Sequence, residues 1–446
     1  MNLLLRDPAS IPDTLPGEPP SGAATGVGLW ARVALGLATL PLVAAAAVPL
    51  WLPYLALVAL YGRPPVALRA AQVRRYVNAI LHGQPPAPGL TLARRLYLLV
   101  LVLRKAVMVP LPGLAWLLDE VLYGRRLDAV PLEAPLFEVS AGRSGSTQLA
   151  RYFEDDPRLA APSLLLAMFP YLWLHRLVRS TVGRFVSADT VRRKIEATLP
   201  TAFVERHEVD PFRTDTFDGA LFIAHLNSYC FFVGPDMAAE DFAMGRAAPV
   251  NRALWEEDFV VLLERIGRKR LFDAGPGPDG APRRLFVKGH FLAGAPALAR
   301  RFPDARFFTM LREPAPRFQS GINYIRVNPI DPVLGPPAWP WLVAGALRTE
   351  VEYCQVEKAW FTAPDGPRRC VLRFHEYLAD LPGTLRRVYA ECLDSTPPPD
   401  APTEHPPRRR SHYQVDRSLE QLGIDAVALH LHLADYVAWC RGYGAG

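Results

Sequence analysis

The feature that most limits how this chain can fold is a run of 30 residues, 33–62, that contains no Asp, Glu, Lys, Arg or His. A helix needs about 20 apolar residues to cross a hydrocarbon core, so we expect a membrane span within residues 27–63. Pro41, Pro49 and Pro53 would each remove a helical hydrogen bond, which makes a shallow re-entrant hairpin a rival geometry. A buried helix pair of a soluble domain is a third interpretation, but soluble cores seldom contain so long an uncharged run. A signal peptide fits poorly, because the run is too long and begins too late.

The charges that flank this run differ between its two sides. Arginines are more frequent after the run than before it, where acidic residues also occur (after: Arg63, Arg69, Arg74, Arg75; before: Arg6, Arg32, with Asp7, Asp13, Glu18). Cytoplasmic flanks of membrane spans are enriched in Lys and Arg. The asymmetry therefore predicts that the carboxy-terminal bulk of the chain is cytoplasmic.

A second apolar stretch, Leu96–Tyr123, is interrupted by Arg104 and Lys105. This pattern predicts an amphipathic helix pair that lies on the bilayer or on the rest of the protein, and not a second span. A shortened chain that begins near Gly124 should then be far more soluble than the full chain.

The composition as a whole is that of a globular protein. Half of the 446 residues are hydrophobic, which is enough for a sizeable core. A net charge of +6 is too small to indicate nucleic-acid binding, and it suits an anionic ligand or a membrane surface equally well. The five cysteines form no Cys-x-x-Cys pair, so neither a zinc site nor a disulfide framework is indicated. A reducing compartment is the default expectation.

A glycine-containing turn follows the first buried strand that the sequence predicts. The apolar run 135–140 (PLFEVS) is typical of a strand and leads into 141–148 (AGRSGSTQ) and then into a helix-like segment. In such a turn, backbone N–H groups and the helix amino terminus converge on one point and favour an anion. No lysine follows Gly145, so the loop lacks the Walker pattern of nucleotide triphosphatases.

The order Gly-Arg-Ser-Gly-Ser-Thr at 142–147 resembles the 5′-phosphosulfate loop of the sulfotransferases that depend on 3′-phosphoadenosine-5′-phosphosulfate (PAPS). In that family, backbone amides and hydroxyl groups of the loop hold the 5′-phosphosulfate. The resemblance implies the same contacts for five residues of this chain: Arg143, Ser144, Gly145, Ser146 and Thr147.

A second element with suitable chemistry follows at a distance. Strand-like runs at 285–288 and 305–311 enclose a helix-like segment at 293–302, an order that implies a parallel sheet with ligands at its carboxyl edge. Arg312 ends the second run and Ser320 lies eight positions later, a spacing that resembles the family's 3′-phosphate element. An arginine fork and a serine hydroxyl together favour a phosphate dianion.

The resemblance covers about 135–425 and is poor at 157–284. Within it, 371–394 looks like the last core strand and its buttressing helix, and 408–425 is similar to a strip that folds back over the nucleotide. Arg408, Arg409 and Arg410 are candidates there for neutralising the 3′-phosphate.

Sulfuryl transfer needs a base for the acceptor hydroxyl and a cation beside the departing oxygen, but it needs no metal. Residues 287–290 (VKGH) resemble the Lys-x-His segment of soluble sulfotransferases. We therefore expect His290 to be the base and Lys288 and Arg143 to be the catalytic cations. Other branches of the family use a glutamate, which leaves four rivals for the base: Glu205, His207, Glu208 and Glu240.

These inferences predict an α/β protein with a P-loop-type three-layer domain, whose parallel sheet is flanked by helices, and an amino-terminal membrane helix region. We expect a flexible segment at 1–26, the span or hairpin at 27–63, and a membrane-proximal helical region at 64–130. The catalytic domain would occupy 131–446, with a helical acceptor-binding insertion at about 157–283.

The resemblance implies PAPS as the sulfuryl donor, and attachment to a membrane favours a lipid-like or other amphiphilic hydroxyl as acceptor. Two other functions stay open. A P-loop kinase or nucleotide hydrolase would need a Walker lysine and an acidic strand end for magnesium, and neither is found. In a catalytically silent, membrane-bound nucleotide-binding scaffold the fold would be kept without the activity, and the cationic and hydroxyl residues that both phosphate elements retain argue against such decay.

Overall fold

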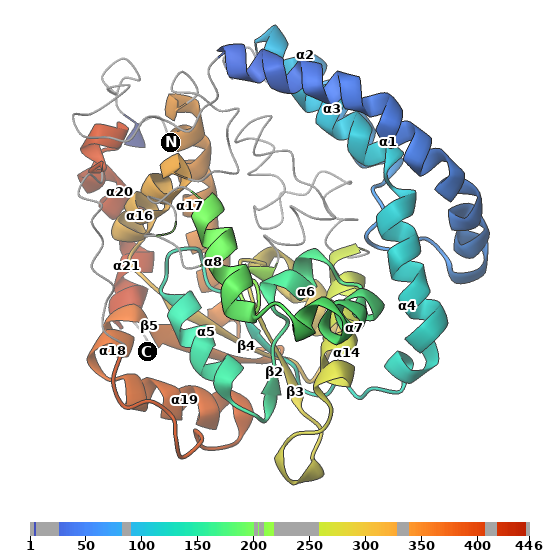
Figure 1. Cartoon of the computed structure of the whole chain (residues 1–446). Coiled ribbons are helices and arrows are strands. Elements are labelled where there is room, and N and C mark those ends of the chain that lie inside the picture. The colour runs from blue at the N-terminus through green and yellow to red at the C-terminus, as the bar shows by residue number, and fades with distance from the viewer. Residues whose placement is uncertain are drawn as a thin grey trace.

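The computed structural model describes residues 4–5, 26–82, 91–199, 204, 209–217, 258–327, 339–405 and 417–442. Its centre is a five-stranded sheet in the order β2-β3-β1-β4-β5, and every neighbouring pair of strands is parallel (Figure 1). The strands are β1 (Leu136–Glu138), β2 (Leu159–Ala160), β3 (Arg284–Lys288), β4 (Arg306–Leu311) and β5 (Arg368–Arg373).

Helices account for most of the remaining described residues. In chain order the α-helices are α1 (Gly26–Tyr61), α2 (Ala70–His82), α3 (Leu92–Val107), α4 (Pro110–Asp128), α5 (Ser146–Asp155), α6 (Leu164–Met168), α7 (Leu172–Ser180), α8 (Ala188–Thr198), α14 (Val260–Ala274), α15 (Ala295–Arg301), α16 (Pro314–Val327), α17 (Trp339–Thr362), α18 (Phe374–Ala379), α19 (Leu381–Leu393), α20 (Ala426–His432) and α21 (Ala434–Arg441). Short 3₁₀ turns are η3 (Val182–Arg184), η6 (Pro278–Gly280), η7 (Leu292–Gly294) and η9 (Glu420–Leu422).

The sheet lies between two layers of helices. Alternate side chains of a strand point to opposite faces, and accordingly Phe137 and Phe307 belong to one buried cluster, while Phe286 and Phe308 belong to the other. Helices α14, α15 and α17 cover the first face, and α5 and α19 cover the second. The three-layer α/β architecture and the strand–helix–strand order at 284–311 confirm the prediction from the sequence.

Helix α1 is continuous through its three prolines, so the re-entrant hairpin is not formed. Figure 1 shows α1, α2 and α3 as an arch that extends away from the sheet. A Cβ at Gly36 would lie 2.6 Å from Val100, and Tyr54 packs on Gly113. From Gly36 to Tyr54 along α1, the contacts thus move from α3 to α4. Helix α1 therefore runs in the same direction as the α3–α4 pair.

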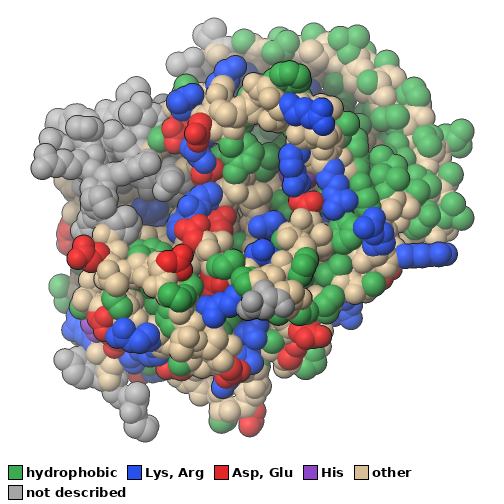
Figure 2. Space-filling view, turned by 60° about the horizontal axis from the view of Figure 1, so that its bottom comes forward, with side chains coloured by type: hydrophobic (Ala, Val, Ile, Leu, Met, Phe, Trp, Pro, Cys, Tyr) green, Lys and Arg blue, Asp and Glu red, His purple; other side chains and the backbone are tan. Residues whose placement is uncertain are grey.

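Only one stripe of α1 is buried, although the helix is apolar on all sides. Val33, Ala47 and Tyr54 face the neighbouring helices, whereas Leu42 and Leu52 on other sides are 71% and 79% exposed. Figure 2 shows apolar side chains gathered over the side of the molecule that carries α1 and α4. A helix that is hydrophobic all round normally meets an apolar environment on every side.

Within the described ranges, two helical runs are long and apolar enough to cross a membrane, 28–61 and 95–128. The second run consists of two helices, as the charged interruption predicted, and its α4 half is part of the folded domain. Asp119 of α4 forms a fully buried ion pair with Lys269 of α14 at 2.8 Å. The same carboxylate accepts hydrogen bonds from the backbone amides of Leu172 and Trp173, which begin α7.

The solubility of a chain that begins near Gly124 stays a prediction, but this boundary falls inside α4. Such a chain would lack most of α4, including the buried residues Trp116, Leu117 and Asp119. The buried Lys269 would then lose its counter-ion, an arrangement that strongly destabilises proteins.

Candidate active site

Three loops meet at the carboxyl edge of the sheet. The phosphate-loop segment 139–147 follows β1, residues 288–290 end and follow β3, and Arg312 follows β4. Because β1 lies between β3 and β4, the loop has one of the other two segments on each side. Ligands of open parallel sheets bind at this edge.

The loop has the backbone geometry of an anion cradle. Arg143 and Gly145 both adopt positive φ, 66° and 88°, and α5 begins directly after them at Ser146. A Cβ at Gly145 would lie 2.7 Å from the Phe374 ring, so only glycine fits there. Alternating backbone conformations of this kind turn successive N–H groups towards one point, next to the positive end of the helix.

Within the described part of the chain, the Ser144 hydroxyl is fully buried and has no hydrogen-bond partner. Buried hydroxyl groups are normally bonded, so the loop contains a polar group that suits a bound ligand.

On the side of the loop next to β4, two arginines and a serine come together. Arg143 Nε donates to Ser320 Oγ at 3.1 Å, and Arg312 Nη1 donates to the backbone oxygen of Arg143 at 2.6 Å. The Arg143 guanidinium also lies over the Tyr324 ring and that of Arg312 over the Phe374 ring. The spacing of Arg312 and Ser320 therefore does bring the second phosphate element onto the first.

The positive charges on this side of the loop favour the binding of an anion. Burial lowers the pKa of Arg312, and the nearby cations of Arg143 and Arg317 lower it further. No carboxylate in the described ranges forms an ion pair with Arg312 that would offset this repulsion. A phosphate dianion between the two guanidinium groups would do so with charge-assisted hydrogen bonds.

The Lys288–His290 segment lies on the opposite side of the loop, next to β3. Lys288 is 1% exposed, donates to Thr147 Oγ1 at 2.8 Å and forms an ion pair with Asp215 at 3.5 Å. His290 Nδ1 lies 2.8 Å from the Ser140 carbonyl oxygen. A carbonyl only accepts, so Nδ1 carries the proton, and in the neutral ring Nε2 carries the lone pair.

His290 Nε2 lies beside the loop. It is 3.5 Å from Thr216 Oγ1, and a Cβ at Gly142 would be 3.5 Å from it. The imidazole thus lies near Gly142, where a Cβ would make only an ordinary van der Waals contact with it.

All the sequence-predicted site residues within the described ranges lie at this edge: Arg143, Ser144, Gly145, Ser146, Thr147, Lys288, His290, Arg312 and Ser320. The rival bases Glu205, His207, Glu208 and Glu240 and the basic residues 408–410 lie outside the described residues. Among the residues that are described, no group of three His, Cys, Asp or Glu side chains is placed to hold a metal ion.

Sequence reasoning missed the contribution of residues 214–217. Asp215 and Thr216 reach Lys288 and His290 from a segment in which we found only a poor resemblance to the family's motifs. Only the short polar run RTDT hints at it, and such runs are common in surface loops.

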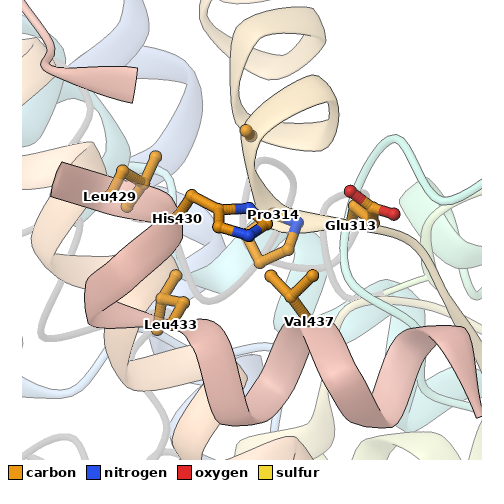
Figure 3. A pocket seen from close by; sticks show the side chains of 7 residues that line it. Glu313, Pro314, Leu429, His430, Leu433 and Val437 are labelled. Carbon is orange, nitrogen blue, oxygen red and sulfur yellow. The ribbon is translucent and has the colours of Figure 1, made fainter. Parts of the chain in front are cut away.

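A small cleft lies next to Arg312 but is separate from this site. It is bordered by the start of α16 and by α20 and α21, with His430 and Pro314 among its lining side chains (Figure 3). Glu313, which also lines it, is held by Arg441, and this contact lowers the pKa of Glu313. None of the lining residues is one of the predicted site residues.

Comparison with known proteins agrees with this geometry. The family model described as sulfotransferase family matches residues 135–394, which is more than half of the chain. No curated protein sequence matches significantly.

Two solved structures are similar in fold. The sulfotransferase STF9 from Mycobacterium avium is 19% identical, with a TM-score of 0.54 over 83% of this chain and 89% of that one. The sulfotransferase STF1 from Mycobacterium tuberculosis H37Rv is 18% identical, with a TM-score of 0.55 over 86% of this chain and 97% of that one. The family match, on a parallel sheet that brings two anion-binding elements to one edge, shows that this chain belongs to the sulfotransferase family.

Proposed function

We propose that this sulfotransferase moves a sulfuryl group from PAPS to the hydroxyl group of a lipid-like acceptor at a membrane. The observation that carries the choice of donor is the division of the site into two polar ends. Arg143, Arg312 and Ser320 form one end, and Lys288 and His290 lie at the other. PAPS carries a 3′-phosphate and a 5′-phosphosulfate, and it thus has one anionic group for each end.

The residues of the loop fit such a donor. The left-handed residues Arg143 and Gly145 turn backbone N–H groups inwards, and the buried Ser144 hydroxyl needs a hydrogen-bond partner. When bound, PAPS would supply an activated sulfuryl group whose leaving group is a phosphate oxygen. We infer that the loop amides, Ser144, Ser146 and Thr147 hold the 5′ end, and that Arg312 and Ser320 hold the 3′-phosphate.

The two cations of the site differ in position, which supports different roles. Lys288 contacts Thr147, the last residue of the loop, so its ammonium group is suited to stabilising charge on the departing oxygen. The Arg143 guanidinium reaches Ser320 and is suited to the 3′ end. If Arg143 also served the departing oxygen, its side chain would have to leave Ser320.

His290 is proposed as the base that takes the acceptor proton. The Ser140 carbonyl fixes the tautomer by accepting from Nδ1, so Nε2 is the proton acceptor. A backbone partner also holds the ring in one orientation, as general base catalysis requires.

The lipid-like acceptor is proposed from the amino-terminal helices. Helix α1 presents an apolar surface beyond its buried stripe, and this supports attachment to a bilayer, where a lipid-like hydroxyl would be concentrated. The excess of arginines after α1 further supports a cytoplasmic catalytic domain. Protease protection of a carboxy-terminal tag in sealed cells tests that orientation, since a lumenal or external domain would be digested from outside.

Calorimetry with the product nucleotide, 3′-phosphoadenosine-5′-phosphate (PAP), and with ATP tests the donor. Strong binding of PAP and weak binding of ATP, unaffected by magnesium, is the expected result. Preferential, magnesium-dependent binding of ATP would contradict the proposal and favour a kinase or nucleotide hydrolase. Release of PAP from PAPS in the presence of a detergent extract of membrane lipids then tests for turnover, which a silent scaffold would lack.

A further inference from the structure

A buried acid lies directly beneath the phosphate loop and has no part in the roles assigned above. Glu138, the last residue of β1, is 0% exposed. Its Oε1 accepts a hydrogen bond from the Ser140 amide at 3.1 Å. Its Oε2 has no hydrogen-bond partner among the described residues. A carboxylate with an unbonded buried oxygen is costly unless it takes up a proton.

The Lys288 ammonium group acts electrostatically on the carboxyl group of Glu138. The two residues are paired across β1 and β3, and their side chains point to the same face of the sheet. Asp215 lies on Lys288 as well, at 3.5 Å. Lys288 thus has two acidic neighbours, and both compete with an incoming phosphate group for its charge.

Among the described residues, the groups that act most strongly on the Glu138 carboxyl lie on β3, in the loop and on α17. Burial raises its pKa to about 7; Lys288 of β3 and the Ser140 side chain and amide of the loop oppose the rise, and Glu357 of α17 adds to it. When Glu138 is protonated, Asp215 is the one of these two acids that still competes for the charge of Lys288. An ionised Glu138 makes the local charge of the three groups negative, which opposes binding of an anion.

We propose that Glu138 is a positioning residue, whose protonated form frees the charge of Lys288 for the anionic 5′ end of the donor. This inference rests on the proposed PAPS site. An anion bound in the loop would in turn favour the neutral carboxyl group. Nucleotide binding is therefore accompanied by uptake of a proton from solvent, which resides on the Glu138 carboxyl.

The test is the pH dependence of PAP binding in the full chain, compared with Glu138→Gln. Glutamine keeps an oxygen for the Ser140 amide but is always neutral. The ratio of the dissociation constants, wild type over Glu138→Gln, should be near 1 at pH 6 and rise to about 10 at pH 8, because binding to the ionised form requires a proton. The titration of the ligand's own phosphates is common to both proteins and cancels in the ratio.

Glu357→Gln is a matched control. Glu357 is also fully buried and has a raised pKa, but it bonds to Thr309 and Tyr436 on the opposite face of the sheet. Its ratio to wild type should change with pH far less than that of Glu138→Gln, because Glu357 has the smallest of the named effects on the pKa of Glu138.

A second measurement needs no variant. Calorimetry in two buffers of different ionisation enthalpy should find uptake of close to one proton per PAP by the wild type at pH 8, where the ligand's phosphates, with a pKa of about 6, are already ionised. PAP binding with a constant ratio and no proton uptake would overturn the role of Glu138 and leave the donor site intact. Failure of the wild type to bind PAP at any pH would instead overturn the proposed donor.

Discussion

Arg312 is the residue with the clearest separate role in ligand binding, because its guanidinium bridges the two phosphate elements through the Arg143 carbonyl. We predict that Arg312→Ala weakens PAP binding by about 1.5–3 kcal/mol, the usual contribution of a hydrogen bond to a charged group. Arg312→Lys should restore only part of it, since an ammonium group cannot form the two-pronged contact of a guanidinium. Calorimetry is the measurement.

Arg301→Ala is the control for the Arg312 experiment. Arg301 is a helix arginine that pairs with Glu264, away from the loop. Its replacement should leave the affinity for PAP unchanged. An equally unchanged affinity in Arg312→Ala would remove this residue from the 3′-phosphate site.

Replacing His290 should slow turnover without changing the affinity for PAP. We predict that His290→Ala lowers turnover by about 10²–10⁴-fold, the typical contribution of general base catalysis, and leaves PAP affinity nearly intact. Single-turnover kinetics and calorimetry measure the two quantities. If turnover stays near normal, the base is elsewhere, and Glu205, His207, Glu208 and Glu240 are the next positions to replace.

Glu138 should also make the stability of the fold depend on pH. Its pKa is raised from 4.5 to about 7, so the folded state binds the proton more tightly than the unfolded chain does. The resulting stabilisation is complete below pH 4.5 and is lost as the pH rises through 7, by up to about 3 kcal/mol. Glu138→Gln lacks this loss. Its free energy of unfolding relative to wild type should therefore rise between pH 5 and pH 8, and a constant difference would contradict the raised pKa.

At the scale of elements, α4 belongs with the catalytic domain. We predict that a shortened chain that begins at Met108 folds and unfolds cooperatively, whereas one that begins at Gly124 is less stable by at least about 3–5 kcal/mol, the usual cost of removing one partner of a buried ion pair. Thermal unfolding followed by circular dichroism compares the two chains.

The Lys269→Met substitution tests the reason for that difference. In the chain that begins at Gly124 it removes the uncompensated charge and should recover part of the stability, although the cavity left by Trp116 remains. In the chain that begins at Met108 it should destabilise, because Asp119 would lose its partner. Equal stability of the two shortened chains would show that α4 is dispensable.

The elements that the sequence predicted correctly are those with a strong local pattern. The apolar strands at 135–140, 285–288 and 305–311, the turn with its two glycines and the uncharged helix each depend on neighbouring residues alone. The site residues on them could be found because a parallel sheet gathers the ends of its strands at one edge.

What could not be predicted depends on contacts between distant segments. The placement of α4 is fixed by Asp119 and Lys269, which are far apart in sequence and each resemble an ordinary surface charge. Asp215 reaches Lys288 in the same way. The side-chain direction of Arg143 depends on Ser320, so the sequence alone could not divide the cationic roles between Arg143 and Lys288.

At the scale of the whole molecule, the exposed face of α1 should control attachment to membranes. Leu42, Leu52 and Leu60 are 71%, 79% and 77% exposed, so replacing all three with Lys should release the protein from neutral phosphatidylcholine vesicles and leave its folding intact. Flotation of the full chain with vesicles measures attachment. Val33→Ala and Ala47→Gly on the buried stripe are the control, since they should lower stability and leave attachment unchanged. Unaltered flotation of the triple variant would contradict a lipid-facing role for this surface.

The shared direction of α1 and the α3–α4 pair limits how often the chain can traverse a bilayer. Two consecutive crossings by a chain have opposite directions, so helices that run the same way could both cross only if the segment between them crossed back. That segment, 62–91, holds α2 as its described helix, 13 residues long and thus about 20 Å, shorter than a hydrocarbon core of about 30 Å. It also carries Arg63, Arg69, Arg74 and Arg75. At most one of these two apolar runs is therefore a crossing. Because Asp119 ties α4 to the folded domain, that crossing would be α1: either α1 crosses the bilayer and its two flanks lie on opposite sides, or it lies in the interface and both flanks share one compartment.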